Sequence, residues 1–365
     1  MRLRSNARTH LPTSSLLAVT LGFTPPALAG LSQPHIWCWG DNGFGQCDIP
    51  AELVNVIDAR AGDHHTAALS ASGLVTCWGS NQFGQCAVPA GLPAFVQIAC
   101  GGVHTLALTA DGQVYSWGAG VSRGSGWPNF GQSAVPANLS NVVQVEAGEY
   151  FSIARHADGT LTCWGSNEFG QCDVPAGLPG IVDVAGGHHV VALLTDGTVS
   201  CWGGFSPEEC TVPIWLADVV DVAAGESHSA ALRSDGTVVC WGSNVFGQCD
   251  VPPDLENVVA ISAGGYHTIA RLSDGTVRAW GRGDSAQCDV PRDVAGATSV
   301  ACFGYHSVAV AYQEPGDLNG DATVDGGDLA ILLGLWGVVT PPFGDLDGDG
   351  TIGGADLAIL LGSWN

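Results

Sequence analysis

Seven Trp-Gly pairs recur along the chain at an almost constant spacing. They begin at Trp39, Trp78, Trp117, Trp164, Trp202, Trp241 and Trp280. Successive pairs are 39, 39, 47, 38, 39 and 39 residues apart. A fixed period of this length is typical of repeat architectures, in which each unit buries its apolar face against its neighbours. The chain is therefore predicted to contain an array of seven similar units.

Each unit carries the pattern of a β-hairpin. A second recurring position lies 13 residues before the Trp in six units. The residues at this histidine position are His65, His104, Phe151, His189, His228, His267 and His306. Between the two positions, apolar alternating stretches flank an Asp-Gly or Ser-Gly pair. Asp-Gly supplies the positive φ angles of a tight turn, so two antiparallel strands are predicted in each unit.

The repeats at the two ends of the chain are incomplete in complementary ways. Trp39 has no histidine position before it, and His306 has no Trp-Gly after it. A whole unit is recovered if residues 35–50 pair beside residues 298–312. A closed ring needs this pairing of its two ends, whereas a linear solenoid does not. Ring closure also removes exposed sheet edges. We therefore predict an all-β, seven-bladed β-propeller over residues 31–313, closed by pairing of its N- and C-terminal ends, with a solenoid as the alternative.

The repeat resembles a known family. The segment "GGVHTLALTADGQVYSWG", residues 101–118, is similar to the regulator-of-chromosome-condensation repeat. The "VPAGL" that follows the Gly-Gln turn in some units resembles the bacterial branch, which includes a secreted propeller that inhibits β-lactamases. The resemblance implies a β-propeller. It says little about function, because the family includes nucleotide exchange factors, inhibitors and scaffolds.

Cysteines bracket the turn after five of the Trp-Gly pairs, always nine positions apart. The pairs are Cys38/Cys47, Cys77/Cys86, Cys163/Cys172, Cys201/Cys210 and Cys240/Cys249. The third unit has Ser116 and Ser133 at both positions, and joint loss is what a bond between them predicts. Zinc and redox sites favour Cys-x-x-Cys spacing instead. We predict five disulfides, each stabilising the fold by roughly 2–3 kcal/mol. Cys100, Cys288 and Cys302 remain outside these pairs, and a Cys288–Cys302 bridge is one option.

The first 29 residues have the pattern of a secretory signal peptide. Three arginines precede an apolar run at residues 16–23, and the small-x-small sequence Ala27-Leu28-Ala29 follows. The formal net charge of −24 becomes −27 once these three arginines are removed. A surface of this charge repels phosphate backbones, so nucleic-acid binding is not expected. No other segment has the ~20 apolar residues of a membrane span. The mature protein is expected to be secreted or attached to the cell envelope.

No catalytic constellation stands out in the repeats. The histidines, tryptophans and turn aspartates recur with the hairpin, so we interpret them as structural. Residues 118–133, the long loop of the third unit, depart most from the repeat. Arg123 and Trp127 in this loop belong to the residue types that dominate binding hot spots. The loop is a candidate binding element, with an ordinary exposed insertion as the alternative.

After residue 313 the repeat stops and two similar twelve-residue segments follow, 28 residues apart. Oxygen-bearing residues at positions 1, 3, 5 and 12 of each match the spacing of a calcium loop. The proposed ligands are Asp317, Asn319, Asp321, Asp325 and Asp328 with the Thr323 carbonyl, and Asp345, Asp347, Asp349 and Asp356 with the Thr351 carbonyl. An apolar helical stretch follows each loop. Two calcium ions are predicted, and without them this acidic region is expected to unfold.

The duplicated pattern resembles type I dockerin domains, which have Asp at position 12. The resemblance implies a calcium-dependent docking domain over residues 314–365 and a cohesin-like or envelope receptor as its partner. Positions 10 and 11 are Gly326-Gly327 and Gly354-Ala355 instead of the Ser-Thr-like pair of cohesin-binding dockerins. This departure puts binding to a standard cohesin in doubt.

Together these patterns predict a secreted, non-catalytic interaction scaffold. Its propeller would bind a protein through one face or through the loop of the third unit. The first alternative is a carbohydrate-binding or hydrolytic subunit of a polysaccharide-degrading complex, which needs an acidic pair or an exposed aromatic row on one face. Guanine nucleotide exchange is a further alternative, against which export and the strong negative charge argue.

Overall fold

The computed structural model describes residues 34–120, 127–292, 294–312, 316–318, 324–338, 344–346 and 351–364. The expected signal peptide, residues 1–29, lies outside the described residues, as does Arg123. Within the described part, the order of elements is twenty-one strands followed by two helices, with one short 3₁₀ helix, η1 (Pro207–Cys210), between β13 and β14.

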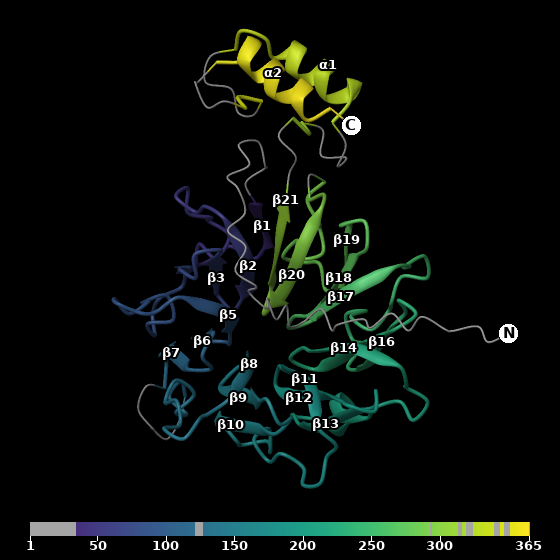
Figure 1. Ribbon diagram of the computed structural model, residues 1–365. Helices are drawn as coiled ribbons and strands as arrows, with labels where there is room; N and C mark the ends of the chain where they lie inside the picture. The colour runs from purple at the N-terminus through teal and green to yellow at the C-terminus, as the bar shows by residue number, and fades with distance from the viewer. Residues whose placement is uncertain are drawn as a thin grey trace, which may run out of the picture.

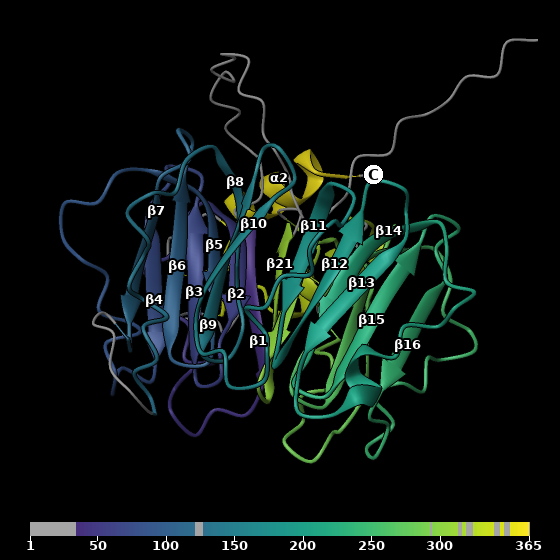
Figure 2. The same ribbon diagram turned by 90° about the horizontal axis from the view of Figure 1, so that it is seen from below.

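Seven three-stranded antiparallel sheets form the body of the molecule, arranged around a central axis (Figure 1). Six are consecutive in sequence: β2 (Val56–Ala61), β3 (His65–Ser70), β4 (Val75–Gly79); β5 (Phe95–Cys100), β6 (His104–Thr109), β7 (Val114–Gly118); β8 (Val142–Ala147), β9 (Phe151–His156), β10 (Leu161–Gly165); β11 (Ile181–Gly186), β12 (His189–Leu194), β13 (Val199–Gly203); β14 (Val219–Ala224), β15 (His228–Arg233), β16 (Val238–Gly242); β17 (Val258–Ala263), β18 (His267–Leu272), β19 (Val277–Gly281). The seventh contains β20 (Ala297–Phe303), β21 (His306–Tyr312) and β1 (Pro34–Gly40). Figure 2 shows the sheets standing side by side as blades. The all-β prediction is confirmed.

The predicted hairpins are the second and third strands of each blade. At the turn between β18 and β19, Gly275 adopts a φ of +84°, which residues with a Cβ rarely adopt. A Cβ there would lie 2.6 Å from the Cα of Gly296. The turn therefore needs glycine both for its backbone angle and for its contact with the start of the next blade.

The seventh blade is assembled from both ends of the chain. β1 pairs antiparallel with β21, with Trp39 opposite Ser307 and Gly40 opposite His306. Residues of the neighbouring blade complete the core on one side, where Val56 and Ala59 pack in one buried cluster with Val308 and Val310. The segments near residues 35–50 and 298–312 thus lie together, as the incomplete end repeats required.

A chain of hydrogen bonds through the histidine position links neighbouring blades. Each histidine Nε2 lies 2.7–3.0 Å from a hydroxyl at the start of the second strand of the next blade: His65–Thr105, His104–Ser152, His189–Ser229, His228–Thr268, His267–Ser307 and His306–Thr66. Each of these hydroxyls donates to the backbone carbonyl of a Gln or Glu in the loop between the blades, at 2.8–3.1 Å. Because the hydroxyl hydrogen goes to the carbonyl, its oxygen must accept from Nε2–H.

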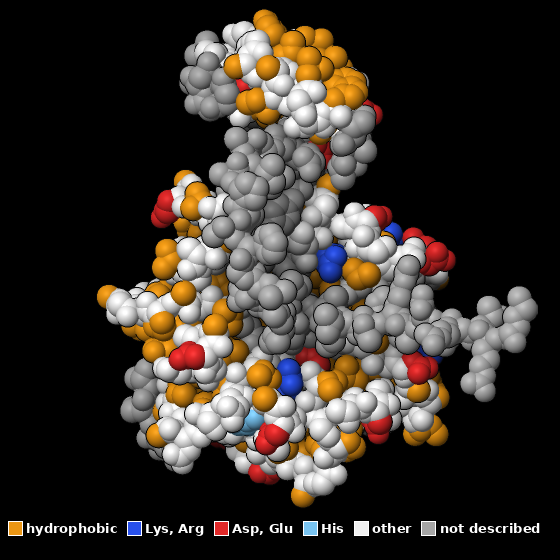
Figure 3. Space-filling model, viewed as in Figure 1, with side chains coloured by type: hydrophobic (Ala, Val, Ile, Leu, Met, Phe, Trp, Pro, Cys, Tyr) orange, Lys and Arg blue, Asp and Glu red, His pale blue; other side chains and the backbone are white. Residues whose placement is uncertain are grey.

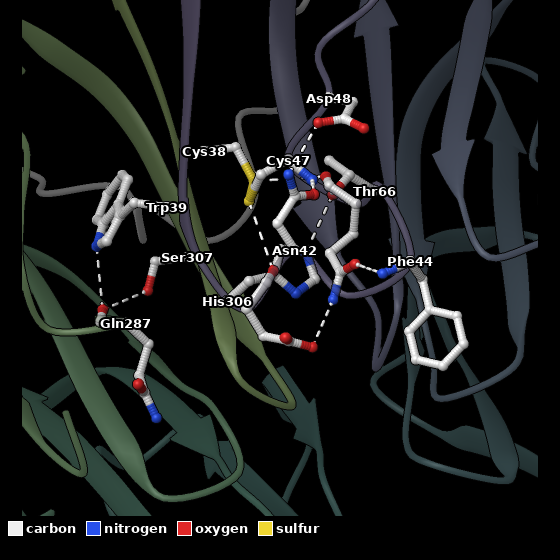
Figure 4. Close-up of a disulfide and its surroundings, with 12 residues drawn as sticks. Cys38, Trp39, Asn42, Phe44, Cys47, Asp48, Thr66, Gln287, His306 and Ser307 are labelled. Atoms are coloured by element: carbon white, nitrogen blue, oxygen red, sulfur yellow. Dashed lines mark hydrogen bonds between the residues drawn. A yellow bond between two sulfur atoms is a disulfide. The ribbon is translucent and has the colours of Figure 1, made fainter. Parts of the chain in front are cut away.

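Five of the recurring tryptophans also donate to a carbonyl at this loop position. The indole nitrogens of Trp39, Trp117, Trp164 and Trp280 donate to a carbonyl that also accepts one of these hydroxyls, at 2.8–3.0 Å. The indole nitrogen of Trp202 donates to the Gln171 carbonyl at 3.1 Å, beside the blade that lacks the hydroxyl. Figure 4 shows this arrangement at the junction of the two chain ends, where Trp39 and Ser307 both donate to the Gln287 carbonyl. The recurring Trp and His are therefore structural residues that join blades, as the sequence indicated.

One interface replaces this polar chain with an apolar contact. Phe151 takes the histidine position, and the position that carries a hydroxyl elsewhere is Val190 in the following blade. Both are buried and belong to one hydrophobic cluster. A phenylalanine has no ring nitrogen, so a hydroxyl opposite it would lose a partner. The two positions have changed together, which shows that they act as a pair.

The C-terminal region holds two short helices, α1 (Gly326–Gly334) and α2 (Gly354–Gly362). They enclose a small core of Val324, Leu332, Ile352 and Leu360. Backbone hydrogen bonds from Gly337 N to the Ile352 carbonyl, at 2.8 Å, and from Ile352 N to the Val338 carbonyl, at 3.2 Å, tie the halves together. The two halves are equivalent in sequence, so this core is a duplicated unit packed on itself.

The interface pairing predicts non-additive effects of mutation. Thr268→Val should destabilise the protein by about 1–3 kcal/mol, because it leaves the buried Nε2–H of His228 without an acceptor. Adding His228→Phe recreates the Phe151–Val190 pair and should cost less than the sum of the two single changes. Chemical denaturation of the four proteins measures this coupling. Strict additivity would contradict the assignment of His228 and Thr268 as a pair.

Candidate functional site

Three of the five predicted cysteine pairs are bonded in the structure: Cys38–Cys47, Cys163–Cys172 and Cys201–Cys210. Cys77, Cys86, Cys240 and Cys249 are free thiols. In these two pairs the second thiol donates to a backbone carbonyl, from Cys86 to Ser80 at 3.2 Å and from Cys249 to Ser243 at 3.4 Å. The structure thus departs from the five-bridge prediction at Cys77/Cys86 and Cys240/Cys249.

The remaining cysteines are also free thiols. Cys100 and Cys302 are buried, and the Cys288 thiol donates to the Arg282 carbonyl at 3.1 Å. A Cys288–Cys302 bridge is not formed in the structure. Burial raises the pKa of Cys302 to about 12, which makes this thiol a poor nucleophile near neutral pH.

Several predicted calcium ligands are buried in the C-terminal region. Asp328 and Asp356 each begin a helix, and the carboxylate of each accepts two backbone N–H groups. Asp328 receives Leu318 N and Asp325 N at 2.7 and 2.8 Å, and Asp356 receives Leu346 N and Gly353 N at 2.7 Å. Asp317 is also buried. These bonds hold the last carboxylate of each loop against the first residues of that loop.

The other predicted ligands are only partly described. Asp325 caps α1 by accepting from Gly327 N at 2.7 Å, and Asp345 and Thr351 belong to the described residues. Asn319, Asp321, Thr323, Asp347 and Asp349 lie outside them. Among the described residues no group of three or more His, Cys, Asp or Glu could hold a metal ion. The donors that are described are carboxylate oxygens, which suit calcium, and both calcium sites stay predictions.

Trp127 of the long loop lies exposed on one face of the propeller. Its indole packs edge-on against Phe83, with ring centroids 5.4 Å apart, and donates to the Tyr150 hydroxyl at 3.1 Å. It therefore bridges the units before and after its own. The Trp127 side chain is 65% exposed despite these contacts.

Trp127 is part of a larger surface, which we call the collar face. It is formed by the loops between first and second strands together with the Phe-Gly-Gln turns that follow the third strands. Its aromatic residues are Phe44, Phe83, Trp127, Phe130, Tyr150, Phe169, Phe205, Phe246, Tyr266 and Tyr305. Phe44 packs against His64, with ring centroids 4.5 Å apart, and each of the others contacts another ring of this set with centroids 4.0–5.9 Å apart. Of these, Phe44, Trp127, Phe169, Phe205 and Phe246 are exposed.

Three carboxylates stand at one repeat position within the collar face. Asp63, Glu149 and Glu226 each lie two residues before the histidine position, where the other four units have glycine. Glu149 Oε2 lies 2.7 Å from His188 Nε2, the distance of an ion pair when the ring is protonated. Asp63 makes no hydrogen bond or ion pair with the described residues. A signal for these residues was present in the sequence, because an acid replaces glycine at a repeat position, but the sequence analysis did not use it.

The acids influence one another's ionisation. Burial raises the pKa of Asp63 well above its ordinary value, and the charges of Glu149 and Glu226 raise it further. Burial also raises the pKa of Glu226. Burial alone would lower the pKa of His188, but its hydrogen bond to Glu149 and the surrounding acids outweigh burial and raise it. The collar face therefore concentrates negative charge, which His188 and Arg282 partly offset.

The only cation stacked on the collar aromatics, among described residues, is Arg282. Its guanidinium carbon lies 4.8 Å from the ring centroid of Phe246, 5.3 Å from Tyr305 and 5.7 Å from Tyr266. Asp284 pairs with the same guanidinium at 2.7 Å. One sector of the collar face thus already holds a guanidinium by a combination of rings and a carboxylate.

The inner strands surround a small cavity of about 90 Å³. Arg60 in this cavity pairs with Asp58 at 3.0 Å. Glu146 also lines it, and burial raises the pKa of Glu146 to about 7 although the charge of Arg60 opposes the shift. The cavity is too small for most ligands, since ligand pockets typically have several times this volume. The collar face is the more extensive candidate site.

Known proteins share both the repeat and the fold. Residues 56–85, 95–132, 142–171, 219–248 and 258–287 match the regulator of chromosome condensation (RCC1) repeat. These five segments, each from a different blade, therefore resemble the RCC1 repeat. Comparison with curated protein sequences found no match.

Several solved structures resemble the chain in fold at low sequence identity. Prp20p from Saccharomyces cerevisiae is 20% identical, with a TM-score of 0.65 over 84% of this chain and 95% of that one. Human WBSCR16 is 19% identical, with a TM-score of 0.62 over 77% and 99%. The ectodomain of the Arabidopsis thaliana receptor kinase ACR4 is 21% identical, with a TM-score of 0.54 over 70% and 100%. These likenesses establish the fold and leave function open. In the described part of the chain, no helix is long and apolar enough to cross a membrane.

Replacing Asp63 should stabilise the protein at neutral pH. The folded-state pKa of Asp63 is raised, so its ionisation opposes folding and its cost grows as the pH rises above the ordinary carboxyl pKa of about 4. Asp63→Asn should therefore raise the melting temperature more at pH 8 than at pH 5. Asp158→Asn, at an exposed turn, is the control. An equal gain at both pH values would contradict the charge repulsion described here.

Proposed function

We propose that this protein is a secreted, non-catalytic scaffold whose propeller binds a protein partner through the collar face. The observation that carries this proposal is the set of exposed aromatic side chains that several units contribute to the same face of the propeller. Tryptophan and other aromatic anchors dominate protein interfaces.

The RCC1-type structures give a precedent for protein binding and no more. The structure of Prp20p was described together with its binding properties to Gsp1p and histones, and a further structure shows the yeast protein bound to Kap60. We carry over only the use of the propeller as a protein-binding platform. Guanine nucleotide exchange is not proposed, because a signal peptide would remove the chain from cytosolic GTPases.

We further propose that the C-terminal region, residues 314–365, is a calcium-dependent docking domain that attaches the propeller to an extracellular or envelope assembly. Figure 3 shows hydrophobic side chains gathered on its helices. Leu333 and Trp336 in one half are exposed, as are Leu361 and Trp364 at the equivalent positions of the other. A duplicated apolar surface suits docking to a receptor, cohesin-like or otherwise. Because β1 pairs with β21 and so joins the two ends of the propeller in one blade, this tail would attach the propeller to the assembly as a rigid body.

Carbohydrate binding is a second candidate, because the collar face has the aromatic row that it requires. Its rings favour a protein, however, since many pack edge-on or tilted against a neighbour and do not lie flat for a sugar to stack on. Affinity electrophoresis in gels containing soluble polysaccharides tests this candidate. Retardation by a polysaccharide that the Trp127→Ala change abolishes would replace protein with sugar as the ligand.

Calcium should order the C-terminal region of the full chain. Calcium-loop ligands are brought together only on folding, so binding contributes folding free energy. Adding millimolar calcium to the mature protein should increase its helical circular dichroism, and Asp328→Asn combined with Asp356→Asn should abolish the change. Asp158→Asn with Asp196→Asn is the matched control, because it removes two carboxylates from propeller turns. An unchanged spectrum in the wild type would contradict the docking-domain proposal.

Partner capture tests the scaffold proposal directly. The full mature chain, immobilised in calcium buffer, should retain defined proteins from the source organism's secreted fraction. Trp127→Ala with Phe169→Ala should lose the partner of the propeller, whereas chelation of calcium should release the partner of the tail. If both treatments leave the retained proteins unchanged, neither proposed surface is the binding surface.

A further inference from the structure

We propose that the collar face recognises a basic segment of its partner, with an arginine or lysine side chain seated among Asp63, Glu149 and Glu226. This inference rests on the proposed function, that the propeller binds a protein, and names the chemistry of that protein's contact surface. It is carried by the aromatic surface, by the cation that one sector already holds, and by the distribution of charge.

The three acids reach the same region from three different blades. The charges of Glu149 and Glu226 both act on Asp63, and His188 lies within reach of all three acids. Of the three acids, only Glu149 lies at ion-pair distance from His188, with 2.7 Å between Oε2 and Nε2. Among the described residues nothing donates to the Asp63 carboxylate, so it is available to a donor from outside.

Glycines in the neighbouring blades make room for the acids. A Cβ on Gly102 would lie 2.6 Å from Asp63 Oδ2 and 3.0 Å from Glu149 Cγ. A Cβ on Gly265 would lie 2.7 Å from Glu226 Oε1. Contacts this short do not occur for real side chains, so a larger residue at either glycine would displace the carboxylate. The repeat thus alternates acids with glycines that accommodate them.

Arg282 shows how this surface holds a guanidinium. It lies over Phe246, Tyr266 and Tyr305, at 4.8–5.7 Å, while Asp284 pairs with it. Another sector repeats the aromatic part of this arrangement, where Trp127 and Phe130 both contact Tyr150. No cation of the described chain lies over those rings. An arginine from a partner would find rings and a neighbouring carboxylate, Glu149, in the same combination.

The charge of the whole chain selects the same class of partner. The formal net charge is −24, or −27 without the signal peptide, which steers basic proteins toward the surface. Long-range attraction alone would be unspecific, because acids lie over the whole surface. Specific recognition therefore requires that carboxylates of the collar face matter more than an equal number elsewhere, and this difference can be measured.

The test uses the full mature chain in calcium buffer and a short fluorescent arginine–glycine peptide, read by anisotropy. Peptides in which citrulline or glutamate replaces arginine are the ligand controls. The collar variant combines Asp63→Asn, Glu149→Gln and Glu226→Gln. The matched control variant combines Asp158→Asn, Asp196→Asn and Asp274→Asn, which removes the same charge from exposed turns at the opposite ends of the second strands.

We expect the collar variant to weaken binding of the arginine peptide by about tenfold or more and the control variant by about twofold or less. Trp127→Ala should also weaken binding, without any change of charge. Citrulline and glutamate peptides should not bind. Equal losses in the two triple variants would overturn the proposal, because they would show attraction to net charge only.

The outcomes also separate this inference from the proposed function. If the immobilised chain retains a partner that is lost in Trp127→Ala with Phe169→Ala but kept in the collar variant, the scaffold function stands and the basic-segment inference fails. If the arginine peptide binds at the collar face while no secreted protein is retained, the preference for a basic segment stands and the scaffold function fails. The collar variant and the control variant should both keep the wild-type circular dichroism. The collar variant should gain stability at neutral pH, from Asp63 and Glu226, whereas the control variant should lose some, because its three carboxylates accept turn hydrogen bonds.

Discussion

The blades are held to one another by a histidine that donates to a hydroxyl, which in turn donates to a backbone carbonyl. This chain fixes the tautomer of each ring and places a polar bond in a fully buried interface. Burial lowers the pKa of His65, His104, His189, His228 and His306 to about 3 and that of His267 to about 4. Because unfolding restores an ordinary histidine pKa near 6.5, stability from these residues is present at neutral pH and is lost as the pH falls below that value.

The same geometry positions the collar face. The loop before each histidine must cross from the inner strand to the second strand, and its residues project around the central axis. In four units the residue two positions before the histidine is glycine, and there the loop only connects the two strands. Where it is Asp63, Glu149 or Glu226, the loop presents a carboxylate whose ionisation opposes folding at Asp63 and Glu226. Residues that cost stability at a surface ringed by aromatic side chains are expected where binding compensates for the cost.

The period of the repeat was enough to predict the blades, the hairpin turns and the pairing of residues near 35–50 with those near 298–312, because these depend on local pattern and on completing each unit. Phe151 was recognised as an exception, but its reason lay in Val190, a contact between blades that a single unit does not reveal. The carboxylates of the collar face, Asp63, Glu149 and Glu226, were missed because a single unit does not reveal that an acid replaces the glycine of the other units. The cysteine pairs at 77/86 and 240/249 share the sequence spacing of the bonded pairs, so spacing could not separate thiols from disulfides.

The most direct test of the blade-joining chain is the ionisation of its histidines, followed by nuclear magnetic resonance of ring nitrogens in ¹⁵N-labelled protein. The six histidines that join the blades should stay neutral, with hydrogen on Nε2, from pH 8 down to about pH 5. His188 provides an internal reference, because its pKa is raised and its ring should become protonated in that range. If rings at the histidine position titrated near pH 6.5, or carried hydrogen on Nδ1, the histidine–hydroxyl–carbonyl chain would not be what joins the blades.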